Sequence, residues 1–98
     1  ENEWSIWLDF NRKTISSLVP EDSGLFKIHA SMKVLYIGMA QNLKKALQDS
    51  IVDPCLCKGQ RFSYMVNHDS LDNLKMELLK DYKLRHNGKL PACMESAM

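Results

Sequence analysis

Two short apolar runs and a helical run, all within residues 24–50, constrain the fold more than any other part of the chain. The apolar runs span residues 25–30 and 33–38 and are separated only by Ser31 and Met32. So short a connection joins antiparallel neighbours in a sheet. Gly38 then lets the chain turn into a helix over residues 41–50. Its apolar positions recur at helical spacing: Leu43, Ala46, Leu47 and Ile51. We therefore expect a hairpin that feeds a helix.

The segment before this hairpin alternates apolar and polar residues over positions 4–10, which favours a strand. One face of that strand would carry Trp4, Ile6, Leu8 and Phe10. The alternative is an amphipathic lead-in that packs its tryptophans on the core. Asn11 or Thr14 then caps a short helix that runs through Leu18. Ile15 and Leu18 would face inward, and Pro20 ends the helix.

A second alternating segment, residues 61–67, predicts another strand, and a helix follows it. The face of this strand would carry Phe62, Tyr64 and Val66. Asp69 or Ser70 caps the helix, and Asn87-Gly88 closes it. The helix has an apolar stripe of Leu71, Leu74, Leu78 and Tyr82. The fold class is therefore α+β, with a small antiparallel sheet of three strands plus the N-terminal strand, flanked by helices.

Length and composition set broad limits on the kind of protein this is. Ninety-eight residues make one domain. No apolar run approaches the ~20 residues of a membrane span, and the acidic start, Glu1 to Glu3, does not read as a signal segment. These features favour a cytoplasmic protein with no membrane contact. The formal net charge of +1 does not by itself favour nucleic-acid binding, because DNA-binding domains are usually more basic.

The three cysteines offer two interpretations. Their odd number disfavours a secreted disulfide framework, so Cys55, Cys57 and Cys93 are expected to be free thiols. The alternative is a zinc site built from these cysteines and a histidine. Structural zinc more often uses two to four residues between paired cysteines, whereas only Leu56 separates Cys55 from Cys57.

The central stretch resembles the signature of a known family. Gly24-Leu25-Phe26, a nine-residue gap and Tyr36-Ile37-Gly38 look like the two halves of the GIY-YIG motif. The run Met39-Ala40-Gln41-Asn42-Leu43-Lys44-Lys45 is similar to the helix start in the nuclease domain of the bacterial excision-repair incision subunit. The resemblance spans residues 24–94 as the core and leaves residues 1–20 as an N-terminal extension.

The resemblance implies a GIY-YIG-like fold and a metal-dependent cleavage of DNA. That chemistry needs a group that activates water, a guanidinium that stabilises phosphate charge and a carboxylate that holds Mg²⁺ or Mn²⁺. The family's second tyrosine falls on Tyr36 and its metal-binding glutamate on Glu77. The other family positions carry Phe26 for the first tyrosine, Ala46 for the arginine, Ser50 for a histidine or tyrosine, and Met94 for an asparagine. Arg61 is the one cation that would approach the same face from elsewhere.

Simpler interpretations of these two residues remain. Tyr36 is equally well a core aromatic with its hydroxyl at the edge. For Glu77 the favoured interpretation is a solvated helix residue, with Asp81 four positions further on.

These substitutions favour a domain that is not an enzyme and has kept a binding role. DNA or RNA is the first candidate partner, and the basic residues expected at such an interface are Lys44, Lys45, Arg61, Lys80 and Lys83. They would form one phosphate-binding surface if both lysine clusters bordered the same sheet face, with Trp7 nearby. A protein-interaction or scaffold module is the second hypothesis. A weak divalent-metal-dependent endonuclease that uses Tyr36 and Glu77 is the third.

Overall fold

A four-stranded antiparallel sheet forms the centre of the molecule. The computed structural model describes residues 3–30 and 33–95. The strands are β1 (Leu8–Asp9), β2 (Gly24–Ala30), β3 (Lys33–Ala40) and β4 (Arg61–Val66), in the order β1-β4-β2-β3. The helices are α1 (Arg12–Leu18), α2 (Leu43–Ile51), η1 (Leu56–Lys58), α3 (Leu71–Arg85) and α4 (Ala92–Glu95). The α+β class and the order of the main elements agree with the prediction. No helix of the described ranges is both long and apolar enough to span a membrane.

The hairpin of β2 and β3 has the predicted antiparallel pairing. Gly24 pairs with Ala40 at one end and Ala30 pairs with Lys33 at the other, with a bulge after Ile28. Strand β2 also pairs with β4, so it lies in the interior of the sheet. The predicted connection at Ser31-Met32 lies outside the described residues. The helix that follows begins at Leu43, two residues after the predicted start, because the Asn42 side chain caps it by accepting a hydrogen bond from the Lys45 backbone N–H at 3.1 Å.

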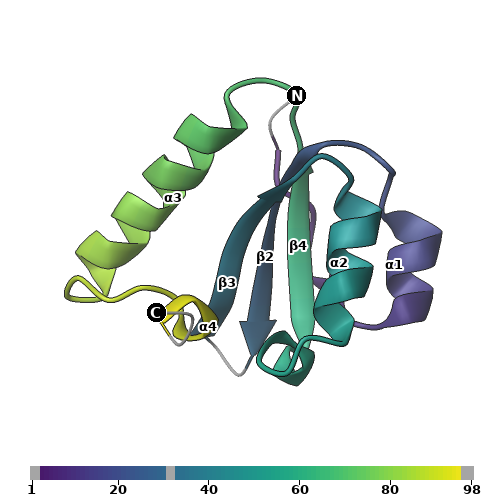
Figure 1. Ribbon diagram of the computed structural model, residues 1–98, viewed down its shortest axis with the longest axis horizontal. Helices are drawn as coiled ribbons and strands as arrows, with labels where there is room; N and C mark the ends of the chain where they lie inside the picture. Colours follow the sequence, from purple (N-terminus) through teal and green to yellow (C-terminus); the bar gives the residue numbers. More distant parts are fainter. Residues whose placement is uncertain (1–2, 31–32, 96–98) are drawn as a thin grey trace.

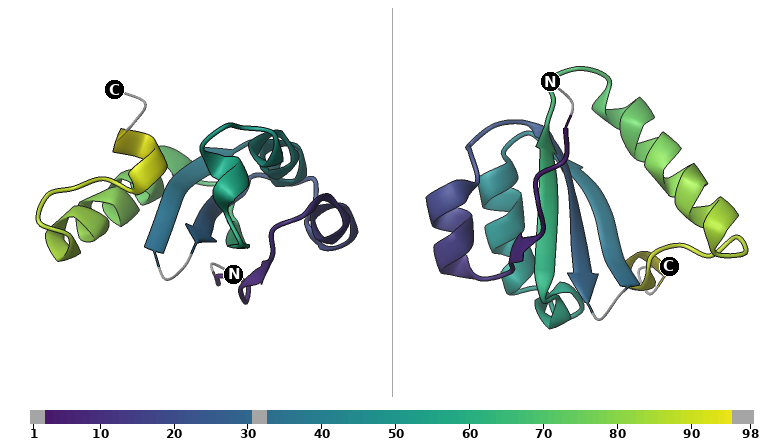
Figure 2. Two further views of the ribbon diagram at one scale, coloured as in Figure 1. Left: turned by 90° about the horizontal axis from the view of Figure 1, so that it is seen from below. Right: turned by 180° about the vertical axis from the view of Figure 1, so that it is seen from behind.

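The sheet has two unlike faces, since neighbouring residues of a strand point to opposite sides. The first, here called the α2 face, is packed against α1 and α2 and carries Phe26, Ile28, Tyr36, Phe62 and Tyr64. The second, here called the tryptophan face, carries Leu25, Lys27, His29, Ser63 and Met65. Figure 1 shows α1 and α2 beside β4, whereas α3 and α4 lie beside β3 at the other end of the sheet. The N-terminal segment crosses the sheet on the side away from α2 (Figure 2).

The N-terminal segment is less regular than its alternation predicts. Only Leu8–Asp9 forms a strand, and Ile6 and Trp7 are 77% and 58% exposed. Ser5 instead holds the segment to β4: its N–H donates to the Tyr64 carbonyl at 2.8 Å, and its Oγ accepts from the Tyr64 N–H at 3.0 Å. A strand with Ile6 on its buried face is therefore wrong. The prediction that Leu18 faces inward is wrong as well, since Leu18 is 54% exposed.

The two ends of the last long helix are only partly as predicted. Ser70 is the cap residue, but it has a left-handed φ of 56° and its side chain makes no capping hydrogen bond. Asn87 and Gly88 have positive φ values of 57° and 82°, and the Gly88 N–H donates to the Lys83 carbonyl at 2.8 Å. The apolar stripe of α3 contributes no fully buried residue. This helix lies against the sheet without entering its core.

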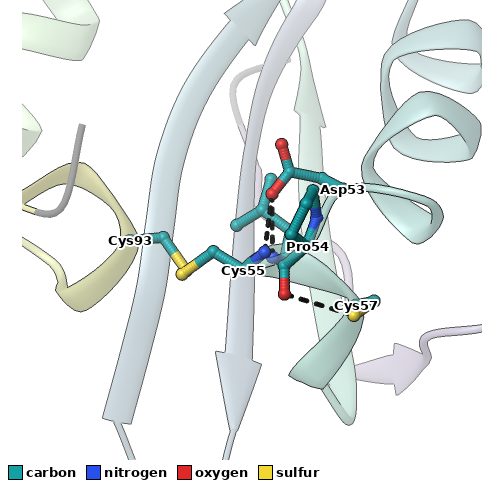
Figure 3. The surroundings of a disulfide bond; sticks show 6 residues. Asp53, Pro54, Cys55, Cys57 and Cys93 are labelled. Atoms are coloured by element: carbon teal, nitrogen blue, oxygen red, sulfur yellow. Dashed lines mark hydrogen bonds between the residues drawn. A yellow bond between two sulfur atoms is a disulfide. The ribbon is translucent and has the colours of Figure 1, made fainter.

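A disulfide joins Cys55 to Cys93, which corrects the expectation that both are free thiols. Figure 3 shows the bond running from the loop after α2 to α4. The loop is itself ordered, because the Asp53 carboxylate accepts from the backbone N–H groups of Cys55 and Leu56 at 2.9 and 3.1 Å. Cys57 is free and exposed. The disulfide uses two of the three thiols that the zinc alternative required, so that alternative is wrong too.

Candidate functional site

Tyr36 lies on the α2 face, where it packs as half of an aromatic pair. It is half-buried, and its ring centroid is 5.7 Å from that of Phe26. Gly38 lies directly beside both rings, and a Cβ at this position would clash with Tyr36 and Phe26. A glycine is therefore required here by the close approach of two rings. The YIG tyrosine and the glycine that follows it form a packed unit in this fold.

The rest of the α2 face near Tyr36 offers little polar chemistry. Phe26 is 4% exposed and carries no hydroxyl. Ala46 packs against the core and presents only a methyl group. Ser50, one turn further along α2, is buried, and its hydroxyl donates to the Ala46 carbonyl at 2.8 Å. The positions that the family resemblance assigns to a phenol, a cation and a second polar group are thus apolar or already hydrogen-bonded.

Glu77 does not join Tyr36. It is exposed on α3 and lines a shallow cavity together with Leu25 and Met65, which belong to the tryptophan face. In residues 3–30 and 33–95 there is no group of three or more His, Cys, Asp or Glu side chains placed to hold a metal ion. The family's divalent cation would need Glu77 and Tyr36 on a shared surface, and the residues here do not fit that arrangement.

Arg61 does not supply the missing cation either. It pairs with His29 in the β2–β4 register, which places it on the tryptophan face. Its guanidinium forms an ion pair with Asp9 at 3.1 Å and donates to the Gln60 carbonyl at 3.1 Å. Arg61 therefore lies across the sheet from Tyr36.

The predicted lysines form two separate groups. Lys44 and Lys45 line a shallow cavity at the start of α2, where Lys45 forms an exposed ion pair with Asp49 at 3.5 Å. Lys80 and Lys83 are exposed on α3, which lies at the other end of the sheet (Figure 1). The described residues that line a cavity with Trp7 include His86, directly after α3, and none of these four lysines.

A cavity of about 520 Å³ on the tryptophan face brings together residues that the sequence analysis did not combine. Its walls include Trp4, Trp7, Lys27, His29, Lys33 and His86. Trp7 stacks on His29 with ring centroids 4.0 Å apart, and the Lys27 ammonium lies 4.5 Å from the centre of the Trp4 ring. One feature of the sequence indicates this polar site. Lys27 and His29 alternate with buried apolar residues in β2, so they form a polar stripe on one face of an interior strand.

Burial changes the protonation of both polar residues of β2. Desolvation lowers the pKa of His29 from its ordinary 6.5 to about 4, and the nearby Lys27 charge adds to this shift. Its Nε2 lies 3.3 Å from the Ser63 hydroxyl. Desolvation also lowers the pKa of Lys27; the Asp81 carboxylate opposes this shift and the Arg85 guanidinium adds to it. At neutral pH the cavity therefore contains a neutral imidazole and a partly desolvated ammonium.

Comparison with known proteins identifies the fold. No protein-family model and no curated protein sequence matches the chain. Among solved structures, it is similar to the magnesium-bound GIY-YIG N-terminal endonuclease domain of UvrC from Thermotoga maritima, with 22% identity and a TM-score of 0.62. That match covers 74% of this chain and 89% of the other. A tyrosine-to-phenylalanine variant of the same domain gives 24% identity and a TM-score of 0.61, over 74% and 88% of the two chains. The chain therefore has a GIY-YIG-like fold.

Proposed function

We propose that this GIY-YIG-like domain binds nucleic acid and does not cleave it. The observation that carries the proposal is the separation of Tyr36 from Glu77. Tyr36 packs against Phe26 on the α2 face, whereas Glu77 lies beside Leu25 on the other side of the sheet. A nuclease of this fold needs the phenol and the metal-binding carboxylate to meet at one phosphate.

The replacement of individual catalytic groups also argues against cleavage. Ala46 stands where the resemblance places a phosphate-stabilising arginine, and no other described cation lies at that position on the α2 face. Removing one preorganised charge-stabilising group typically costs about 10²–10³ in rate. Phe26 also lacks the hydroxyl of the family's first tyrosine. The missing hydroxyl would lower turnover further, although such losses do not simply multiply.

Binding makes smaller demands than cleavage. The UvrC domains of the same fold are described as endonuclease domains. Contact with phosphates requires only accessible cations; of the expected ones, Lys45, Arg61, Lys80 and Lys83 are exposed and Lys44 is half-buried. Among the described residues no carboxylate pairs with Lys44, Lys80 or Lys83. Their ammonium groups are thus available to a phosphate backbone.

Fluorescence anisotropy with labelled single- and double-stranded oligonucleotides tests the proposal. We expect binding at low salt that weakens as salt is added, because bound lysines release counterions. The double variant K80Q/K83Q should lower the salt dependence by about one unit of slope for each phosphate that the protein no longer neutralises. K13Q, on α1 and away from both lysine groups, is the matched control. Absence of salt-sensitive binding to either oligonucleotide would remove nucleic acid as the partner.

A protein-interaction role is the second candidate, and one feature of α3 favours it. Met76 and Leu84 are 68% and 77% exposed on this helix. Large exposed apolar side chains that cluster on one element are typical of a contact surface. The variant M76S/L84S should abolish capture of a protein partner from native host extract and leave oligonucleotide binding intact. A pulldown that returns no reproducible partner would count against this role.

A further inference from the structure

We propose that the cavity on the tryptophan face binds one nucleotide, with the base stacked on Trp7 and the phosphate between Lys27 and Lys33. The inference rests on the proposed nucleic-acid binding and specifies where a base would be held. A phosphorylated base could come from a free nucleotide or from a single strand. The site lies across the sheet from Tyr36 and uses none of the residues to which the family resemblance assigns a role in cleavage.

Trp7 provides the stacking surface. One face of its indole ring lies against His29, with centroids 4.0 Å apart and planes inclined by 16°. Trp7 is 58% exposed, so its side chain keeps accessible surface beyond the contact with His29. His29 is itself buried and lies in contact with the Ser63 hydroxyl, so it supports the indole from below. Stacking on such an aromatic platform is a sequence-tolerant way to hold a base.

Lys27 and Lys33 provide the charge for the phosphate. Lys27 is half-buried, and its ammonium lies over Trp4 instead of against a carboxylate. In residues 3–30 and 33–95 no carboxylate forms an ion pair with Lys27, and a partly desolvated cation of this kind gains from an anion that enters its cavity. Asp81, whose charge acts on Lys27, forms an ion pair with Arg85 at 3.3 Å. The lining residues among those that the structure describes include no Asp or Glu that would repel a phosphate.

The size and composition of the cavity fit such a ligand. Its volume of about 520 Å³ falls within the ~300–1,000 Å³ typical of small-molecule sites. Aromatic and cationic groups occupy the same cavity, as a base and its phosphate require. His86, at the end of α3, closes one side, and its Nδ1–H donates to the Tyr82 carbonyl at 2.8 Å. A shallow lysine patch alone would offer the charge but no stacking surface.

Intrinsic fluorescence reports on this cavity directly. Trp4 and Trp7 are the chain's two tryptophans, and both line it. The probes are adenosine monophosphate and a single-stranded oligodeoxyadenylate, excited where adenine does not absorb. We expect saturable quenching by at least one probe. Labelled oligodeoxyadenylate in an anisotropy titration measures, in parallel, binding anywhere on the protein.

Two variants with matched controls locate the contacts. W7A removes the exposed ring and K27M removes the charge while keeping the alkyl stem. Each should weaken binding of the quenching probe roughly tenfold to a hundredfold. I6A, at the exposed neighbour of Trp7, and K13M, on α1, should bind as the parent does. Circular dichroism and thermal unfolding of each variant check that it is folded.

The outcomes separate this inference from the proposed function. Quenching by the strand, abolished in W7A, supports both. Quenching by adenosine monophosphate without strand binding supports the cavity site and removes the nucleic-acid role. Anisotropy binding that leaves the tryptophan fluorescence unchanged overturns the cavity site and leaves the nucleic-acid role intact. Quenching by neither probe overturns the cavity site.

Discussion

The two helices that flank the sheet, α2 and α3, carry similar leucine stripes but have different places in the molecule. In α2, Leu43 and Leu47 are fully buried in the core cluster, and Asn42 caps the helix. In α3, which is longer, no residue is fully buried and no side chain caps the start. A helical stripe therefore predicts which side of a helix faces the protein, and not how deeply that side is buried. The consequence is functional, because Glu77 lies on the weakly packed helix.

Substitution of one leucine in each helix gives the largest expected contrast. L47A removes buried methyl groups from a fully packed site and should lower the free energy of unfolding by about 2–5 kcal/mol. L78A, from a half-buried position on α3, should cost about 1 kcal/mol. Urea unfolding of both variants measures the difference. Equal losses would mean that α3 is as much a core element as α2.

The disulfide sharpens the comparison, because it holds the segment that follows α3. Replacing both Cys55 and Cys93 with alanine should cost about 2–4 kcal/mol, since the bond closes a span of 38 residues. C57A is the control, and it should leave stability unchanged because that thiol is exposed and free. Thermal unfolding with and without a reductant measures the effect. A parent protein that is insensitive to reductant would contradict a stabilising disulfide.

A pH dependence of stability is expected from His29 on the tryptophan face. Because burial lowers its pKa from 6.5 to about 4, the unfolded chain binds a proton more readily between these values. His29 thus contributes stability that is complete above pH 6.5 and is lost as pH falls toward 4. The slope should be at most about 1.4 kcal/mol per pH unit. The urea midpoint is measured at each pH for the parent and for H29Q. The difference between the two midpoints isolates the contribution of His29 from that of the carboxylates. A difference that does not vary over this range would contradict a neutral, buried imidazole.

Much of the fold could be predicted from local sequence features. The hairpin, the caps at Asn11 and Asn42, and the strand over β4 follow from periodicity and from side chains that satisfy nearby backbone groups. The Cys55–Cys93 bond could not, because α4 brings together two residues that an odd cysteine count treats as free. A disulfide is uncommon in the cytosol, so the cysteine count no longer supports a cytoplasmic location.

The candidate site was harder to predict than the fold. Sequence spacing groups Tyr36, Phe26 and Ala46 through the motif, and in the structure all three pack on the α2 face. It could not show that Glu77 faces the other side, because the direction of α3 depends on packing between distant residues. The cavity lined by Trp4, Trp7 and Lys27 was hard to predict for the same reason. It forms where the N-terminal segment packs across β2 and β4, and that packing joins residues far apart in the sequence.

The central claim is that this domain has a GIY-YIG-like fold but does not cleave DNA. A time course with labelled DNA, purified protein and either Mg²⁺ or Mn²⁺ tests it most directly, in parent and Y36F proteins side by side. We predict that the DNA stays intact with both proteins. Metal-dependent cleavage by the parent that disappears in Y36F would contradict the account.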